Sequence, residues 1–401
     1  MKTSILALGF ALALGGAAAA QEKTIKIGVL TDNSGLYADV AGPGASLATK
    51  MAVEDSGLVA KGWKIDIISA DHQNKADVAT SVARQWIDVD KVDVIVDVVN
   101  SGVGLAVSTI AKEKNKIMLA NGPASSELTN TQCSPNTVHW AYDTYMLSTG
   151  TGKAIVKNGG DTWFFLTADY TFGKTLEEET SNVIKNNGGK VLGAVRHPLG
   201  TADFSSFLLQ AQASKAKIIG LANAGGDTTN SIKAASEFGI VAGGQKLAAL
   251  LLFISDVNSL GLQIAQGLTF TASFYWDLND GTRAFSERFA KQMKNGNKPT
   301  MVQAGDYASV LHMLKAIEAV GSVADGAKVV AKMKEMPTDD ALFGKGVIRA
   351  DGRKIHPVYL FEVKKPSESK YPWDYYTVKA TIPGDEAFRP LSESKCSLVT
   401  K

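Results

Sequence analysis

Near its N-terminus the chain reads Ile25-Lys26-Ile27-Gly28-Val29-Leu30 and then Thr31-Asp32-Asn33-Ser34-Gly35-Leu36-Tyr37. The first part is mostly apolar and β-branched, which predicts a buried β-strand, and the polar residues after it predict a turn. Residues 45–55 repeat small or apolar side chains at helical spacing and close at Ser56-Gly57, which predicts an amphipathic helix. A strand that leads into a helix is the unit of a parallel sheet.

The same alternation of strand and helix runs through the chain twice. The first set of expected strands is 25–30, 64–69, 93–99 and 116–119, with helices over 45–55 and 76–89. The second set has strands at 162–167, 190–195, 217–222, 247–254 and 268–273, with a helix over about 174–187. Two helices near 282–295 and 303–320 follow, and then strands at 346–349, 358–363 and 373–378. We therefore expect two α/β halves, because 401 residues also exceed one comfortable hydrophobic core.

The composition excludes two broad classes of protein. Hydrophobic residues make up 45% of the chain and charged residues 20%, which is enough apolar material to offset chain entropy and excludes disorder. The 42 basic residues are balanced by 40 acidic ones, with a net charge of +2 and no basic run. This balance argues against a nucleic-acid-binding protein.

Residues 1–20 predict a secretory signal peptide. Met1-Lys2 supplies a positive start, residues 5–14 are apolar, and Gly15-Gly16-Ala17-Ala18-Ala19-Ala20 forms the small-residue exit. The alternative, a membrane anchor, is disfavoured because the apolar stretch is too short to span a bilayer. We expect cleavage near Ala20 and export of the rest of the chain.

Export determines how Cys133 and Cys396, the two cysteines of the chain, are interpreted. In an oxidising compartment they are expected to form a disulfide, with two buried free thiols as the alternative. The disulfide would tie the C-terminal tail to the middle of the chain. No metal site is expected, because no third or fourth ligand stands at a suitable spacing.

The familiar signatures of enzymes are absent from the sequence. The chain has no G-x-G-x-x-G after a strand, no phosphate-binding G-x-x-x-x-G-K-[ST] and no G-x-S-x-G. Its five histidines are scattered and none pairs with another at ligand spacing. We expect no cofactor and no catalysis, although an exported enzyme remains an alternative because active sites assemble from distant residues.

Five loops at the ends of expected strands are rich in Gly, Ser and Asn. In open parallel sheets, ligands bind beyond the carboxyl ends of the strands, near helix N-termini. Backbone N–H groups and hydroxyls there suit a small anion or polar group. The alternative is that these side chains only cap helices. The loops are residues 31–37, 100–104, 121–127, 168–173 and 223–227.

The order of these motifs resembles the periplasmic solute-binding proteins of the branched-chain amino acid type, which serve ABC importers. The matching features are Ser34-Gly35, Asn100-Ser101, Asp169-Tyr170-Thr171-Phe172-Gly173 and Asp306-Tyr307. The resemblance implies the type I fold, with two Rossmann-like lobes on parallel sheets joined by three crossovers. Lobe 1 is expected to comprise 24–142 plus 274–345, and lobe 2 to comprise 143–273 plus 346–401.

The resemblance also implies capture of a ligand without chemistry. A small molecule docks between the lobes, the hinge closes, and the loaded monomer meets the membrane permease of an ABC importer in the periplasm. The Ser101 hydroxyl matches the serine that meets the ligand carboxylate in relatives. The implied ligand-binding residues are Tyr37, Asn100, Ser101, Gly122, Pro123, Ala124, Tyr170, Phe172, Asn223, Ala224, Phe253 and Tyr275.

One departure from the family pattern concerns the ligand. Amino acid binders hold the ligand's ammonium with an acidic residue, and the aligned run here is Leu250-Leu251-Leu252-Phe253-Ile254. A buried ammonium without a counter-charge costs on the order of several kcal/mol. The resemblance therefore favours an aromatic acid, such as a benzoate or hydroxycinnamate derivative. Branched-chain amino acids and small amides are alternatives, as is a ligand sensor on the same fold. The sequence leaves open whether Asp256, Asp306 or Arg196 reaches the ligand.

Overall fold

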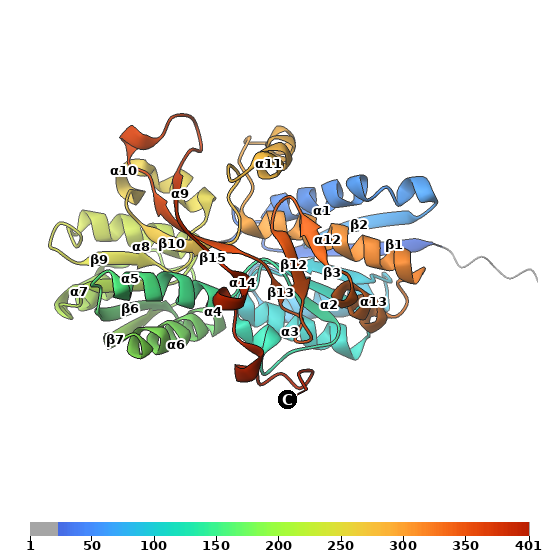
Figure 1. Cartoon of the computed structure of the whole chain (residues 1–401), viewed down its shortest axis with the longest axis horizontal. Coiled ribbons are helices and arrows are strands. Elements are labelled where there is room, and N and C mark those ends of the chain that lie inside the picture. Colours follow the sequence, from blue (N-terminus) through green and yellow to red (C-terminus); the bar gives the residue numbers. More distant parts are fainter. Residues whose placement is uncertain (1–22, 401) are drawn as a thin grey trace, which may run out of the picture.

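Two α/β lobes lie side by side along the long axis of the protein, as Figure 1 shows with the first lobe in blue and cyan and the second in green and yellow. This computed structural model describes residues 23–400. The expected signal peptide, residues 1–20, lies outside them. The two-lobed fold with a parallel sheet in each lobe confirms the predicted fold class.

Five parallel strands form the sheet of lobe 1 in the order β2-β1-β3-β4-β5. They are β1 Thr24–Thr31, β2 Lys64–Asp71, β3 Val94–Asp97, β4 Ile117–Ala120 and β5 Thr137–His139. Helices cover both faces: α2 (Ala76–Asp88) and α3 (Ser101–Glu113) on one, α1 (Gly42–Ser56) and α12 (Met301–Val320) on the other. All four residues of β3 are buried, as expected for a central strand covered on both faces.

Four parallel strands form the sheet of lobe 2 in the order β7-β6-β8-β9. They are β6 Thr162–Ala168, β7 Lys190–His197, β8 Ile218–Ala222 and β9 Lys246–Ala249. The lobe's helices are α4 Thr144–Leu147, a π-helical turn Ser148–Gly152, α5 Lys153–Lys157, α6 Thr171–Asn186, α7 Ser205–Ala213, α8 Gly226–Glu237, α9 Ile254–Leu260 and α10 Leu262–Ala265.

Two small antiparallel sheets complete the structure. One has the order β10-β14-β15 and the other β11-β12-β13. Their strands are β10 Thr269–Ala272, β11 Thr338–Asp340, β12 Gly344–Ile348, β13 Lys354–Ile355, β14 Val358–Val363 and β15 Tyr376–Ile382. The remaining helices are α11 Asp280–Gln292, α13 Gly326–Glu335, α14 Gly384–Ala387 and the short 3-10 helices η1 Val59–Lys61, η2 Ser126–Thr129, η4 Pro366–Glu368 and η5 Leu391–Glu393.

Three expected strands differ from those observed. The strand expected at 247–254 ends at Ala249, because the chain turns there and α9 begins at Ile254. The strand expected at 373–378 begins only at Tyr376, because Trp373 has a left-handed φ of 70° that no strand accommodates. The strand at 269–272 pairs antiparallel with β14 instead of extending the parallel sheet.

The expected lobe boundaries stay a prediction, but part of the last segment contacts lobe 1. Arg353 forms a parallel bridge with His139 of β5, and β12 packs beside α13. The chain then passes to β14 of the second lobe through His356-Pro357. Further on, Cys396 returns to lobe 1, where it forms the expected disulfide with Cys133. This confirms the predicted pairing.

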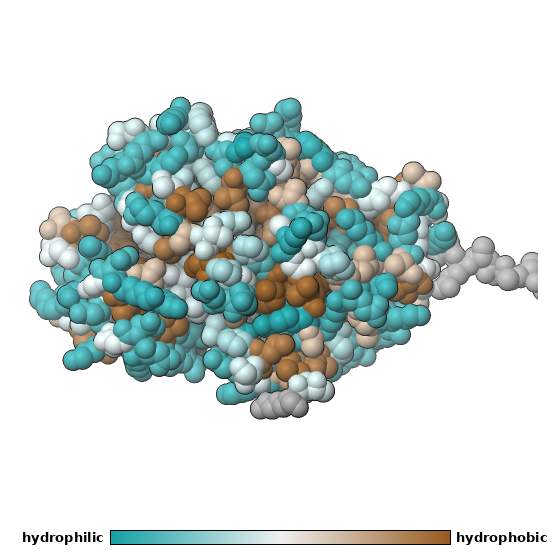
Figure 2. Space-filling model, in the orientation of Figure 1, coloured by the Kyte–Doolittle hydropathy of each residue, from teal (hydrophilic) through white to brown (hydrophobic). Residues whose placement is uncertain are grey.

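Hydrophilic side chains cover most of the face in Figure 2, and apolar ones form small patches. Within residues 23–400, no helix combines the length and the apolar character that crossing a membrane requires. In the same residues, no three His, Cys, Asp or Glu side chains are grouped so that they could hold a metal ion.

Candidate ligand site

A small cavity lies between the lobes, where the carboxyl ends of the two parallel sheets face each other. About 260 Å³ of space there is not filled by protein atoms, part of it open to solvent. The lining residues follow β1, β3, β4, β5, β6, β8 and β9, which is where ligands bind in open parallel sheets. They are Tyr37, Val40, Val99, Asn100, Ser101, Gly122, Ala124, Tyr142, Tyr170, Phe172, Ala224, Leu251 and Phe253.

Ser101 is the first residue of α3, and its hydroxyl is polarised by the loop after β4. The Ser101 Oγ accepts hydrogen bonds from the backbone N–H of Ala124 at 3.2 Å and of Ser125 at 3.0 Å. A hydroxyl has two acceptor lone pairs and one donor hydrogen. Since both lone pairs are used, the hydrogen is the group that Ser101 can offer in the cavity. Such a donor suits a carboxylate oxygen.

The turn between β3 and α3, which leads directly into Ser101, has a strained backbone. Asp97, Val98 and Asn100 have φ values of 74°, 58° and 100°, which side chains with a Cβ rarely adopt. The Asn100 Oδ1 accepts from the N–H of Gly102 at 3.0 Å and of Val103 at 3.2 Å. Asn100 thereby caps α3. Strain of this kind clusters at binding sites, where surrounding contacts hold it in place.

Gly122 allows the loop after β4 to approach the loop after β3. A Cβ at Gly122 would lie 2.5 Å from the Val99 Cα and 2.6 Å from an Asp97 carboxylate oxygen. The Tyr142 hydroxyl donates to the Gly122 carbonyl at 2.7 Å, which fixes the tyrosine beside the cavity. A side chain at position 122 would push the two lobe 1 loops apart.

Tyr37 and Tyr170 close the cavity from opposite lobes. Their hydroxyl oxygens lie 2.6 Å apart, so one donates to the other. Tyr37 is held by Asp32, whose carboxylate accepts from the N–H of Gly35 at 2.8 Å and of Tyr37 at 2.9 Å. Burial raises the pKa of both tyrosines above the usual value. Both hydroxyls therefore remain protonated donors at neutral pH.

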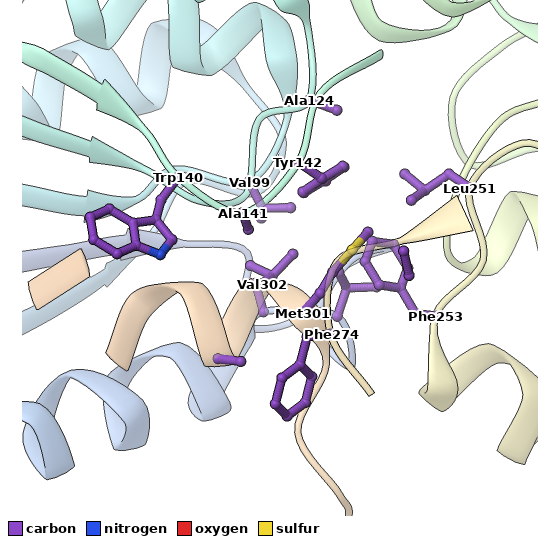
Figure 3. Close-up of a cluster of buried hydrophobic side chains, with 14 of the residues drawn as sticks. Val99, Ala124, Trp140, Ala141, Tyr142, Leu251, Phe253, Phe274, Met301 and Val302 are labelled. Carbon is purple, nitrogen blue, oxygen red and sulfur yellow. The ribbon is translucent and has the colours of Figure 1, made fainter. Parts of the chain in front are cut away.

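Aromatic and aliphatic side chains form the rest of the wall. The rings of Tyr142 and Phe253 meet edge to face with centroids 6.2 Å apart, and those of Tyr170 and Phe172 lie 5.9 Å apart. Figure 3 shows Tyr142 with Val99 to its left, Ala124 above it and Leu251 and Phe253 to its right. This lining suits the body of an apolar, ring-shaped ligand.

No Asp, Glu, Lys, Arg or His is among the lining residues of this cavity. Asp256, which follows Phe253 closely, points back into its own turn. Its Oδ2 accepts from the Phe253 N–H at 2.9 Å, so it caps α9, and burial raises its pKa to about 7. Phe253 and not Asp256 faces the cavity.

The two other charged candidates also lie outside the cavity. Asp306 is buried within lobe 1, where the Asn121 Nδ2 donates to its Oδ1 at 2.8 Å. Arg196 pairs with Glu177 at 3.1 Å near the surface of lobe 2. The N-terminal ends of three helices, α3, α6 and α8, lie at the cavity, and their partial positive charge favours an anion. Besides burial, the carboxyl of Asp227, in the first turn of α8 and outside the lining, helps to raise the pKa of Tyr37 and Tyr170.

Three of the predicted site residues do not line this cavity. Asn223 uses its amide within lobe 2, with His197 Nε2 at 3.2 Å and the Thr228 hydroxyl at 2.8 Å. The Tyr275 hydroxyl donates to the Trp373 carbonyl at 3.1 Å beside a neighbouring cavity. Pro123 packs its ring against Gly104 of α3. The structure brings the other nine together.

Four lining residues were not predicted: Val40, Val99, Tyr142 and Leu251. Val99 and Leu251 lie at or just beyond strand ends, so their position in the chain was a usable signal. Tyr142 lies at the expected crossover between the lobes, where a residue can reach the space between them. Val40 carries no distinguishing signal in the sequence.

The chain matches known proteins over most of its length. Residues 24–370 match the family model described as periplasmic binding protein. The Leu/Ile/Val-binding protein homolog 6 of Brucella melitensis is 26% identical over 366 residues, covering 88% of this chain and 91% of that protein. The crystal structure of a periplasmic binding protein from Burkholderia mallei has 55% identity and a TM-score of 0.91, covering 94% of this chain and 100% of that one.

A more distant structure carries a ligand. A solute-binding protein of an ABC transporter from R. palustris, in complex with 4-hydroxybenzoate, has a TM-score of 0.82 and 24% identity. The match covers 90% of this chain and 97% of that one. At this identity the likeness shows a shared fold.

Proposed function

Since the chain belongs to the periplasmic binding proteins of the type I, branched-chain amino acid family, we propose that it captures a small aromatic carboxylate between its lobes. Solved structures similar to this chain include substrate-binding proteins of ABC transporters. The finer proposal concerns the ligand. It depends on one observation above all: an apolar and aromatic cavity with hydroxyl donors and no carboxylate in its lining.

The two ends of such a ligand have matching partners. The ligand carboxylate would accept from the Ser101 hydroxyl at the N-terminus of α3, where the helix dipole favours an anion. The ring would lie among Tyr142, Phe172 and Phe253. A ligand ammonium would find no counter-charge in the lining and would lose its hydration, which is unfavourable.

Hinge closure would supply the rest of the binding free energy. The ligand docks on lobe 1, lobe 2 closes over it, and hydrogen bonds strengthen as water leaves the cleft. The bonded pair Tyr37 and Tyr170 is the kind of contact that forms only when the lobes meet. We expect the exported protein to act as a monomer and to deliver its ligand to the permease subunits of an ABC importer.

The relatives support different ligands. The R. palustris protein with 4-hydroxybenzoate shows that this fold can hold an aromatic acid. A structure from Burkholderia xenovorans with 41% identity is described as the ligand-binding protein of a branched-chain amino acid ABC transporter. The name of the Brucella melitensis protein favours Leu, Ile or Val. The absence of an acidic side chain from the lining, with Phe253 there instead, supports the proposal of an aromatic acid.

A thermal-shift screen tests the ligand class. Benzoate, 4-hydroxybenzoate, leucine, valine and acetamide are added to the same preparation of the protein. A ligand at 100 times its Kd stabilises the folded state by about 2.7 kcal/mol, so benzoates should raise Tm by several degrees. A shift with leucine and none with the benzoates would refute the proposal. Recovery of the added benzoate unchanged after incubation tests the alternative of an enzyme.

A further inference from the structure

The C-terminal segment crosses from one lobe to the other. It leaves lobe 2 at the end of β15, passes through α14 near the middle of the molecule, and ends beside lobe 1, as the dark red ribbon in Figure 1 shows. This connection is separate from the passage through His356-Pro357, by which the chain enters β14. It is covalent at its far end, because Cys396 is bonded to Cys133.

The segment is held first beside residues 349–356, where the chain passes from lobe 1 to lobe 2; we call this region the hinge. The Phe388 ring is buried against the His356 ring at 5.2 Å and beneath the Arg353 guanidinium at 4.4 Å. The next carbonyl, that of Arg389, accepts from Arg349 Nη1 at 2.8 Å. These contacts fix where the Arg389 side chain starts.

The segment is held again on lobe 1. Besides the disulfide, the Lys395 N–H donates to the Asn130 Oδ1 at 2.8 Å, directly after η2. Residues 388–396 thus have one anchor at the hinge and one on lobe 1. We call residues 388–396 the strap.

Between its two anchors the strap reaches lobe 2. The Arg389 Nη2 lies 2.5 Å from the Glu179 Oε1 of α6 and 3.3 Å from the Ser126 Oγ of η2. The Ser126 hydroxyl itself donates to Glu179 at 2.6 Å. Since Ser126 belongs to lobe 1 and Glu179 to lobe 2, this cluster spans the edge of the cleft. The Glu179 side chain is only 11% exposed.

We propose that the strap stabilises the closed state of the protein, because its anchors present Arg389 to Glu179 only when the lobes are together. When the hinge opens, Glu179 moves away from Ser126, so the Arg389 guanidinium can no longer contact both side chains. Holding one partner in place raises its effective concentration near the other. A carboxylate buried without its cation is strongly destabilising, so losing Arg389 disfavours the closed state.

Two kinds of variant separate the anchor from the ion pair. The double substitution Cys133→Ser with Cys396→Ser releases the end of the strap, and Arg389→Met removes the cation while keeping the disulfide. Arg288→Met is the matched control, because Arg288 of α11 pairs with Asp55 of α1 at 2.9 Å within lobe 1. Small-angle scattering gives the radius of gyration without ligand, and titration with benzoate gives Kd.

We expect the ligand-free radius of gyration to increase and the benzoate Kd to rise at least three-fold in both kinds of variant. A variant that combines the two serine substitutions with Arg389→Met should show no larger a change in radius of gyration or Kd than Arg389→Met alone. The reason is that the disulfide and the arginine act on the same contact. Arg288→Met should match the wild type in both measurements. Unchanged scattering together with unchanged hydrogen exchange in η2 and the N-terminal half of α6 would overturn the proposal.

The titration rests on the proposed function, whereas scattering and hydrogen exchange do not. If the wild type does not bind benzoate, the ligand class is wrong and the strap is judged on the ligand-free protein. If the double serine variant is too unstable, Arg389→Met and Glu179→Gln still test the contact with the disulfide intact. The amide of Glu179→Gln can still accept from Ser126 and Arg389, so it should lose less affinity than Arg389→Met.

Discussion

The Tyr37 hydroxyl of lobe 1 and the Tyr170 hydroxyl of lobe 2 lie 2.6 Å apart over the cavity between the lobes. This hydrogen bond joins residues of two different lobes. The bond therefore belongs to the closed arrangement. A single hydrogen bond contributes about 0.5–1.5 kcal/mol net, which is enough to change an opening equilibrium several-fold.

Removing that bond should weaken ligand retention. We expect Tyr37→Phe and Tyr170→Phe each to raise Kd about 2- to 10-fold, mostly through faster dissociation, with little change in Tm. The double variant should resemble either single variant, because both remove one bond. Stopped-flow and titration measure this. Tyr307→Phe is a control, because the Tyr307 hydroxyl donates to Asp55 at 2.7 Å within lobe 1. Additive losses in the double variant would contradict a direct bond between Tyr37 and Tyr170.

Ser101 should be the main side-chain donor to the ligand carboxylate. We expect Ser101→Ala to weaken benzoate binding by about 1–3 kcal/mol, since a buried anion is left one donor short. Calorimetric titration gives the difference. Ser108→Ala is a matched control on the same helix, because Ser108 bonds Thr137 at 2.8 Å inside lobe 1. It should lower Tm and leave the Kd unchanged, and a wild-type Kd in Ser101→Ala would remove Ser101 from the site.

Phe253 should determine whether the site binds ligands that carry an ammonium group. We expect Phe253→Asp to weaken benzoate binding at least ten-fold, because it sets a carboxylate near an anion and removes a ring from the wall. The same variant should gain affinity for leucine, whose ammonium acquires a partner. Thermal shift with both ligands measures the change. If leucine binds the wild type better than the variant, Phe253 does not select against amines.

Asp256 should make the stability depend on pH. Burial raises its pKa in the folded protein to about 7, while an unfolded Asp titrates near about 3.9. Below about pH 4 both states hold the proton, and as pH rises the unfolded state releases it first, so stability falls until about pH 7. Asp256→Asn keeps an acceptor for the Phe253 N–H, and its free energy of unfolding should not show this decrease with pH. Urea unfolding at pH 4.5, 6 and 8 compares the two proteins, with the exposed Asp385→Asn as control.

If the wild type and Asp256→Asn show parallel stability curves, the carboxyl of Asp256 titrates normally in the folded state. That result would place Asp256 in contact with water. An Asp256 carboxylate in contact with water could then reach a ligand ammonium from the N-terminus of α9.

Much of the fold could be predicted from local pattern. The alternation of apolar strands and amphipathic helices predicted the parallel sheets, because burial on both faces demands apolar runs. The prediction of a strand through Phe253 was wrong, since periodicity cannot show that the chain leaves the sheet after Ala249. Trp373 illustrates the same limit, because it has a left-handed φ and its carbonyl accepts hydrogen bonds from the distant Tyr275 and Trp276.

The candidate site could be predicted only in part. Loops at strand ends were identifiable, because chain order alone places them at one edge of a sheet. Which side chain of a loop faces the cavity was not identifiable: Asn223 turns to His197 while its neighbour Ala224 lines the space. Tyr142 was missed because its role depends on a hydrogen bond to Gly122 that sequence distance does not reveal.

The amino-acid sequence by itself determined the two sheets, the loops that meet between them and the pairing of Cys133 with Cys396, since these follow from periodicity, chain order and cysteine number. Tertiary structure alone decided that Tyr37 meets Tyr170 and that Arg389 reaches Glu179. Both contacts join residues that lie far apart in the sequence. They depend on how the two lobes and the C-terminal segment are placed against one another, and no local pattern encodes that placement.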